Sequence, residues 1–201
     1  YFLVKGDDTI LDLLKNKKYE IFDWIKNTQR TFEIVKDYDF VVIDSYLAPK
    51  KVYDKISEIK NGNLIMIDDY KRIVYPPGIV VNPSIYGDKL KYPKVKGVKY
   101  LLGPKYIILR KEFWNVPEKK INKEIKNILI TFGGTASNEF IEKIERFIKE
   151  NFKNVKIYVV NPNKKKLTAK QMLKLMLKAD LCISAGGQTL YELARVGVPT
   201  I

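Results

Sequence analysis

Short apolar runs alternate with amphipathic segments along the chain. Before residue 111, the apolar runs predict strands at residues 2–4, 19–22, 40–44, 64–68, 79–81 and 100–102. Helical spacing is clearest after Pro49, where Val52, Ile56 and Ile59 recur on one face, and a shorter helical pattern covers residues 10–14. Nearly continuous apolar strands separated by amphipathic helices are typical of a parallel sheet that is covered on both faces.

The alternation resumes after a charged segment. Residues 111–126 carry one proline and little apolar periodicity, which indicates a linker. The pattern then predicts strands at 127–132, 155–160 and 180–185, helices at 138–152, around Met172 and at 189–196, and the opening of a further strand at 198–201. Ser137 or Asn138 is expected to cap the first of these helices.

These elements predict an α/β fold with two Rossmann-like domains that have parallel sheets. The N-terminal domain is expected at residues 1–110 and the C-terminal domain at residues 127–201. Tyr1 is not an initiator methionine, and the last predicted strand only opens. Both domains are therefore expected to be truncated in this chain.

The charge of the chain invites a nucleic-acid interpretation. The net charge is +14, but lysine supplies nearly all of the positive charge and is interleaved with Glu and Asp throughout. Surfaces that read bases concentrate arginine, so nucleic acid is an unlikely partner. No apolar run approaches the roughly 20 residues that cross a bilayer, and no signal-peptide pattern opens the chain. A cytoplasmic location with no membrane partner is the default expectation.

Two residue types limit the chemistry that the chain can carry. The single cysteine, Cys182, lies in an apolar run and is expected to be a buried structural thiol. Histidine is absent, which removes the usual general base, the Ser-His-Asp and Cys-His arrangements and most transition-metal sites. We expect no metal and no cofactor.

Two glycine-rich turns carry the best candidate site. Gly133-Gly134-Thr135 follows the strand at 127–132, and Gly186-Gly187-Gln188-Thr189 follows the strand at 180–185; each leads into a helix. Glycine lets the backbone approach a ligand closely, and the N–H groups at a helix start attract phosphate. Each turn alone is also explained as a tight strand-to-helix connection. Together they converge on the edge where open α/β sheets bind ligands.

Glu192 lies one turn into the second of these helices. Its carboxylate has two interpretations: it accepts hydrogen bonds from both hydroxyls of a ribose, or it is an exposed helix glutamate that only complements the helix dipole.

Residues 179–193, followed by Gly197-Val198-Pro199, resemble a known family. This is the UDP-2,4-diacetamido-2,4,6-trideoxy-β-L-altropyranose hydrolase family of pseudaminic acid biosynthesis, whose relatives include spore coat polysaccharide biosynthesis proteins. The resemblance continues through residues 101–106, 109–110, 112–113, 67–70 and 44–46, and through Asn82-Pro83 and the turn that begins after Phe132 at Gly133-Gly134-Thr135. It spans essentially the whole chain.

The resemblance implies a fold and a set of site residues. The family is similar in fold to the peptidoglycan N-acetylglucosaminyltransferase, so a glycosyltransferase-B-like pair of domains is expected, with UDP in the C-terminal one. The diphosphate would face Gly133, Gly134, Thr135, Gly186, Gly187, Gln188 and Thr189, and the ribose would face Glu192. Residues 167–172 are a less firmly placed rim for the base.

Polar residues of the first domain are candidates for the sugar. Asp69, Asn82 and Tyr106 are expected to bind substrate, and Arg110 is within the same candidate region. The alternatives stay open: Asp68 and Asp69 are as well explained as turn caps, and Tyr106 as a core aromatic. The family carries a catalytic histidine in a glycine-rich loop that would precede Tyr1, and Ser45 stands where the family often has histidine. The catalytic residues are therefore unknown.

The leading hypothesis is a UDP-sugar hydrolase in which water attacks the anomeric carbon and UDP leaves. The resemblance implies inversion at that carbon without a metal. One rival is a glycosyltransferase that uses the same UDP site, and another is a non-catalytic nucleotide-sugar-binding module. Because the histidine that the resemblance implies as the base is missing, residues 1–201 alone are expected to be inactive.

Overall fold

The computed structural model describes residues 1–6, 11–132, 137–161 and 167–201. The chain divides into two compact units, Tyr1–Ile107 and Ile108–Ile201. All the strand pairs described within each unit are parallel. The predicted α/β class with parallel sheets is therefore confirmed, and it fits a Rossmann-like fold.

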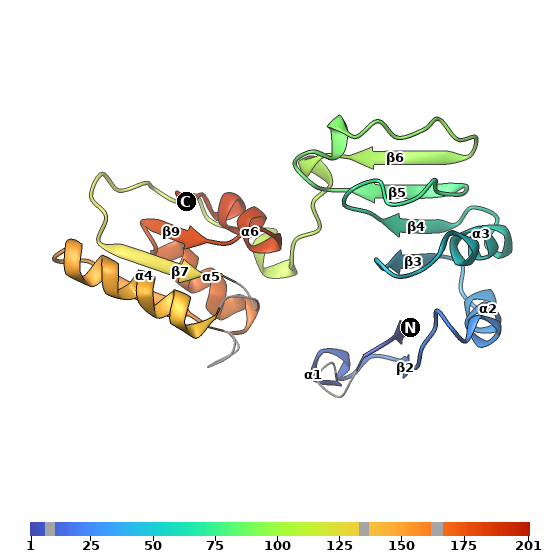
Figure 1. The fold of residues 1–201 in the computed structure, drawn as a ribbon, viewed down its shortest axis with the longest axis horizontal. Helices are drawn as coiled ribbons and strands as arrows, with labels where there is room; N and C mark the ends of the chain where they lie inside the picture. The colour runs from blue at the N-terminus through green and yellow to red at the C-terminus, as the bar shows by residue number, and fades with distance from the viewer. Residues whose placement is uncertain (7–10, 133–136, 162–166) are drawn as a thin grey trace. The chain divides into compact units, whose positions relative to one another are not determined.

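The first unit holds two sheets (Figure 1). Strands β1 (Phe2–Val4) and β2 (Tyr19–Ile21) form a two-stranded sheet. Strands β3 (Val41–Asp44), β4 (Leu64–Ile67), β5 (Gly78–Asn82) and β6 (Val98–Leu102) form a four-stranded sheet in the order β3-β4-β5-β6. The helices are α1 (Leu11–Leu14), α2 (Thr28–Lys36) and α3 (Lys50–Ile59).

The core of the first unit lies between the four-stranded sheet and its helices. Alternate residues of β3 and β4, Ile43 and Met66, are buried against Val52 and Ile56 of α3. Helix α2 was not among the predicted elements. Asn27 caps it, with its side chain accepting from the N–H of Arg30 at 3.4 Å, and its Val35 joins the core.

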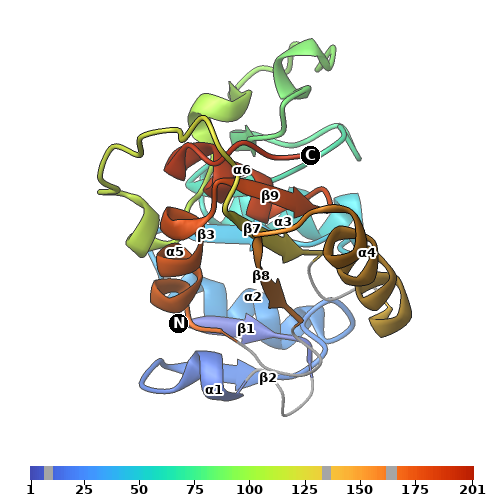
Figure 2. The same ribbon diagram turned by 90° about the vertical axis from the view of Figure 1, so that its left-hand side faces the viewer.

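The second unit has a three-stranded sheet with helices on both faces. Its strands are β7 (Asn127–Thr131), β8 (Lys156–Val160) and β9 (Leu181–Ser184), in the order β8-β7-β9. Figure 2 shows α4 (Asn138–Asn151) and α5 (Ala169–Lys178) on opposite sides of β7. Ile128 and Ile130 pack on the α4 side, whereas Leu129 packs on the side of α5 and α6 (Gln188–Val196). This alternation is why β7 reads as a continuous apolar run.

The first and last residues of the second unit differ from the predicted linker and the predicted final strand. The expected strand at 198–201 amounts to one parallel bridge between Cys182 and Thr200, extended by a hydrogen bond from Ser184 N–H to Ile201 O of 2.9 Å. Residues 111–126, predicted as a linker, lie within the second unit. Phe113 of the short 3-10 helix η4 (Lys111–Phe113) is completely buried in its core.

Candidate functional site

The turn between β9 and α6 presents an uncapped helix start. Gly187 precedes α6 with φ of 108°, a conformation that favours glycine, and no side chain of the described residues caps the helix there. An added Cβ at Gly186 or Gly187 would meet no atom of the described residues within 4 Å, so these residues leave the space beside the turn open. Uncapped N–H groups at the start of a helix, facing open space, favour an anion.

The other predicted turn follows the neighbouring strand. Gly133, Gly134 and Thr135 lie outside the described residues. The strands that lead into the two turns are adjacent, because Thr131 of β7 is the register partner of Ser184 of β9. On the far side of the first turn, Ser137 caps α4 by accepting from the N–H of Phe140 at 3.2 Å, as predicted. The structure therefore brings the two strand ends together at one edge of the sheet.

The segment before the sheet is tied to α6. The Gln188 side chain donates from Nε2 to the carbonyl of Ile108 at 2.5 Å, and Arg195 donates to the carbonyl of Trp114 at 2.7 Å. Thr189 is half-buried in the first turn of α6. Residues 108–114 thus run alongside the helix whose start carries the candidate site.

Arg110 and Glu192 form a bidentate ion pair. Arg110 Nε donates to Glu192 Oε1 and Nη2 donates to Oε2, each at 2.7 Å. The Glu192 side chain is 3% exposed, whereas the Arg110 side chain is 46% exposed. The hydrogen bonds to Glu192 raise the pKa of Arg110. The exposed-glutamate interpretation of Glu192 is therefore wrong; its carboxylate is buried and held in one orientation.

Sequence reasoning missed this pair because its members are 82 positions apart. A signal for the burial was present: Glu192 precedes Leu193, and both stand on the face of α6 that the amphipathic pattern turns toward the core. A buried carboxylate requires a partner, and Arg110 was already a candidate for the site.

A second buried carboxylate lies at the opposite end of β9. Asp180 is 7% exposed and accepts hydrogen bonds from the side chain of Asn122 and from the backbone N–H groups of Lys126 and Asn127, at 2.7, 3.0 and 2.8 Å. Burial acts to raise the pKa of Asp180, but these hydrogen bonds outweigh it and lower the pKa. This residue ties the segment before β7 to β9, away from the glycine turns.

The first unit has its own polar edge at the carboxyl ends of its strands. Tyr46 donates a hydrogen bond to Asp69 and stacks on Tyr70 with ring centres 6.0 Å apart. This hydrogen bond raises the pKa of Tyr46 to about 12. Burial, and then the charge of Asp69, raise the pKa of Asp44. Asp44 and Asp69 therefore face a common region after β3 and β4.

Asp68 and Asn82 belong to a buried network behind that edge. Asp68 accepts from Tyr92 Oη and from the N–H groups of Asp69 and Arg72, so it caps the turn after β4, as one of the two interpretations predicted. Asn82 is completely buried; its side chain donates to Tyr92 Oη at 2.9 Å and accepts from the N–H of Ser84 at 3.1 Å. The predicted contact of Asn82 with substrate stays a prediction.

Two further predicted residues have defined surroundings. Tyr106 is half-buried under Lys105, whose Nζ lies 5.0 Å from the ring centre. Cys182 is completely buried, and burial raises its pKa to about 12, so the prediction of a buried thiol is confirmed. No helix in the described ranges is both long enough and apolar enough to span a bilayer.

The fold and the turns define an α/β protein with Rossmann-like parallel sheets and an anion-favouring helix start. No family profile matches the chain. It is 26% identical to an uncharacterised protein of Methanocaldococcus jannaschii, over all of this chain and 47% of that protein. It is 30% identical to the pseudaminic acid cytidylyltransferase and UDP-2,4-diacetamido-2,4,6-trideoxy-β-L-altropyranose hydrolase of Helicobacter pylori, over 87% of this chain and 35% of that protein.

A spore coat polysaccharide biosynthesis protein of Bacillus subtilis is 26% identical, over 83% of this chain and 56% of that protein. The resemblance to the hydrolase and spore coat polysaccharide family is confirmed by these two named relatives. The chain spans about half the length of the first relative and about a third of the length of the second.

Proposed function

We propose that the protein acts in nucleotide-sugar metabolism for surface polysaccharides, as a hydrolase that releases UDP from a UDP-linked diacetamido-trideoxy sugar. The names of the Helicobacter pylori and Bacillus subtilis relatives support this class of substrate. In this proposal the second unit is the UDP-binding domain, the first unit is the sugar side, and the whole protein has a glycosyltransferase-B-like fold.

The observation that carries the proposal is the start of α6. Its N–H groups are not capped by a described side chain, Gly187 holds the turn open, and no described atom occupies the space beside Gly186. The diphosphate binds there, together with the turn at Gly133, Gly134 and Thr135. Its negative charge, which grows as the bond to the sugar breaks, is stabilised by the N–H groups and the helix dipole.

Glu192 is assigned to the ribose. Each oxygen of its carboxylate accepts one hydrogen bond from Arg110 and can accept a second one. The two ribose hydroxyls would donate these second hydrogen bonds. Because the carboxylate is nearly inaccessible, the ribose must reach it past the half-exposed Arg110 side chain. Arg110 then has two roles: it orients Glu192 and places positive charge beside the diphosphate.

The test is a pair of measurements on the intact gene product. Calorimetric titration with UDP should give saturable binding, and incubation with the UDP-sugar in the absence of any acceptor should release free sugar and UDP. Release only when an acceptor alcohol is added would favour the glycosyltransferase alternative. UDP binding without turnover under either condition would favour a nucleotide-sugar-binding module, and absence of UDP binding would reject the site.

A further inference from the structure

Helix α6 carries a row of polar residues that holds the first residues of the second unit. Gln188, Glu192 and Arg195 follow one another at helical spacing, so they lie along one side of α6. Each of them is hydrogen-bonded to a residue of segment 108–114. Ile107 ends the first unit, so this segment is the part of the chain that enters the second unit. One side of α6 therefore holds the entry segment, residues 108–114.

The two ends of the entry segment are held differently. Phe113 is completely buried in the same cluster as Leu193 of α6, so this end belongs to the core. Ile108 is 60% exposed, and its carbonyl accepts from the Gln188 side chain at the start of α6. Arg110 lies between the two ends, and its guanidinium carbon is 5.3 Å from the centre of the Phe113 ring. The entry segment thus has a fixed end at Phe113 and an exposed end that depends on polar contacts with α6.

Arg110 has donors for a second acceptor besides Glu192. A guanidinium carries five N–H donors, and the bidentate pair with Glu192 uses two of them. The Arg110 side chain is 46% exposed, so a ligand can approach the remaining donors. Its planar fork matches the geometry of phosphate oxygens. Arg110 is therefore suited to bind a phosphate group while it stays paired with Glu192.

The entry segment and the proposed diphosphate site share the first turn of α6. Gln188 begins α6, and Glu192 follows one turn later, about 6 Å along the helix axis. Since Ile108 contacts Gln188 and Arg110 contacts Glu192, the exposed end of the entry segment lies along this same turn. The N–H groups of that turn are the ones proposed to bind the diphosphate. The free energies of holding the entry segment and of binding the nucleotide are therefore linked.

The charge of the diphosphate decides the direction of this link. A diphosphate beside Arg110 attracts the guanidinium, while the buried carboxylate of Glu192 holds it from the other side. Both anions then favour the position that Arg110 has in the structure, so the entry segment stays on α6. The opposite direction would require the nucleotide to displace Arg110, which exchanges the charged partner of a buried carboxylate for neutral hydroxyls.

We infer that residues 108–114 respond to the nucleotide: a diphosphate bound at the start of α6 also binds Arg110 and holds the entry segment on the helix. The inference rests on the proposed function, since it takes the diphosphate to bind at that helix start. Because linkage is reciprocal, a change that loosens the entry segment also weakens nucleotide binding, even where the changed residue lies outside the site. Arg195, in the last turn of α6, is therefore a positioning residue for the nucleotide.

Hydrogen exchange measures how firmly the entry segment is held. At saturating UDP, the amides of residues 109–114 should exchange roughly tenfold or more slowly than in the unliganded protein. Inorganic diphosphate at saturating concentration should slow them as well, whereas uridine, which lacks the phosphates, should not. UDP binding with unchanged or faster exchange would overturn the inference and leave the proposed function standing. Absence of UDP binding would reject both.

Two arginine substitutions test the reciprocal effect. Arg110→Ala should abolish the slowing of exchange by UDP, because the diphosphate then has no contact with the entry segment. Arg195→Ala leaves every group proposed to contact UDP in place but removes the hydrogen bond to the Trp114 carbonyl. It should therefore weaken UDP binding by roughly twofold to tenfold. Arg195→Ala also provides the test where Arg110→Ala does not fold.

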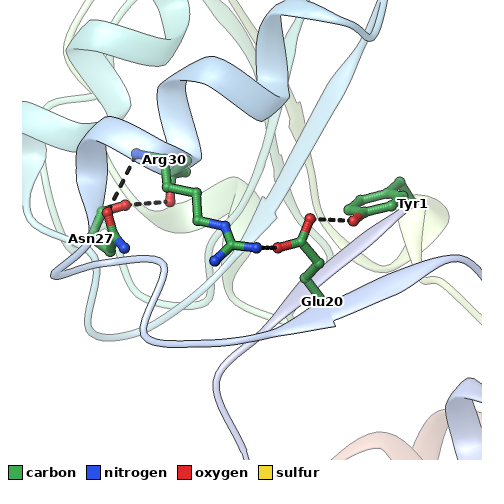
Figure 3. Close-up of polar contacts among 5 residues, drawn as sticks. Tyr1, Glu20, Asn27 and Arg30 are labelled. Atoms are coloured by element: carbon green, nitrogen blue, oxygen red, sulfur yellow. Dashed lines mark hydrogen bonds and ion pairs between the residues drawn. The ribbon is translucent and has the colours of Figure 1, made fainter.

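The matched control is Arg30→Ala in the first unit. Figure 3 shows the Glu20 carboxylate between Tyr1 and Arg30, so this arginine also binds a glutamate, and it joins α2 to β2. The Arg30 side chain is 54% exposed, close to the 46% of Arg110. Arg30→Ala should leave the UDP affinity and the slowing of exchange unchanged. Equal losses of UDP affinity in Arg195→Ala and Arg30→Ala would overturn the inference.

Discussion

At the scale of single residues, the two partners of the Arg110–Glu192 ion pair differ in solvent exposure. Removal of Glu192 leaves a half-exposed guanidinium that water solvates, whereas removal of Arg110 leaves a carboxylate that is 3% exposed without its partner. We therefore expect Arg110→Ala to destabilise the protein by about 2–3 kcal/mol, below the full cost for a buried pair because Arg110 itself is partly in water. Glu192→Ala should cost less, and urea unfolding of both variants measures the difference. Equal losses would show that the exposure of the two partners does not decide the outcome.

Ligand binding separates the two roles of this pair. If Glu192 accepts the ribose hydroxyls, Glu192→Ala should weaken UDP binding by about 1.5–3 kcal/mol, the range for hydrogen bonds to a charged group. The binding free energy of uridine, which lacks the diphosphate, should fall by a similar amount, whereas the affinity for inorganic diphosphate should not change. Calorimetry with the three ligands gives the comparison, and unchanged UDP and uridine affinity would leave Glu192 with only the task of holding Arg110.

The buried carboxylate of Asp180 makes stability depend on pH. Its pKa in the folded protein lies below the unfolded value of 3.8, so its contribution is complete above that value and is lost as pH falls through the folded pKa. Asp180→Asn should therefore lower the free energy of unfolding at pH 7 by about 1–3 kcal/mol, measured by urea unfolding. The difference in unfolding free energy between the variant and the native protein should shrink below pH 3.8. Asp54→Asn, in an exposed i,i+4 pair with Lys50, is the control and should change little at either pH. If Asp180→Asn lowers the free energy of unfolding as much at roughly pH 2 as at pH 7, the ionised carboxylate is not the source of the stabilisation.

At the scale of secondary structure, local pattern predicted most elements because most strands of these sheets are largely apolar. Strand β7 is an example, because its apolar side chains are buried on both faces of the sheet. Helix α4 is another, because its apolar face is buried against β7. Helix α2 was missed: its apolar residues are few, and its Arg30 is used for a contact with β2 that no local pattern encodes. The candidate site divides in the same way. The turn at Gly187 follows from local sequence, but the partners of Glu192, Asp68 and Asn82 come from distant segments.

Helix α6 offers a matched pair of glycines for testing its N-terminus. Gly187 before the helix and Gly197 after it both have positive φ, at 108° and 79°, and neither has a described atom closer than 3.9 Å to an added Cβ. Valine is strained at both positions, and more so at Gly187, whose φ of 108° and ψ of −163° lie in a region that essentially only glycine adopts, so each variant must first be shown to fold. Only Gly187→Val places a branched side chain where the diphosphate would approach, so it should abolish UDP binding while Gly197→Val retains it. Calorimetry on the folded variants decides, and retained binding by Gly187→Val would reject the diphosphate site.

At the scale of the whole molecule, the charge of +14 and the proposed site predict different responses to salt. Scattered lysines bind polyanions through counterion release, which weakens steeply as salt rises. A site built from N–H groups at the start of α6 holds one diphosphate by directed hydrogen bonds and is less sensitive. UDP affinity should therefore fall far less than any DNA affinity between roughly 50 and 200 mM salt, where polyanion binding weakens steeply. Parallel salt slopes for UDP and DNA would favour a nonspecific basic surface.

Catalysis is a property that residues 1–201 should lack even where binding persists. The chain has no histidine to act as a general base, so UDP titration should give a binding signal while the UDP-sugar stays intact. The carboxylates at the edge of the first unit provide the alternative, because burial and the charge of Asp69 raise the pKa of Asp44 and so make its carboxylate more basic. Turnover by residues 1–201, purified free of other hydrolases, would contradict the prediction. Its loss in Asp44→Asn, with Asp54→Asn as the control, would then assign the base to Asp44 instead of to a histidine.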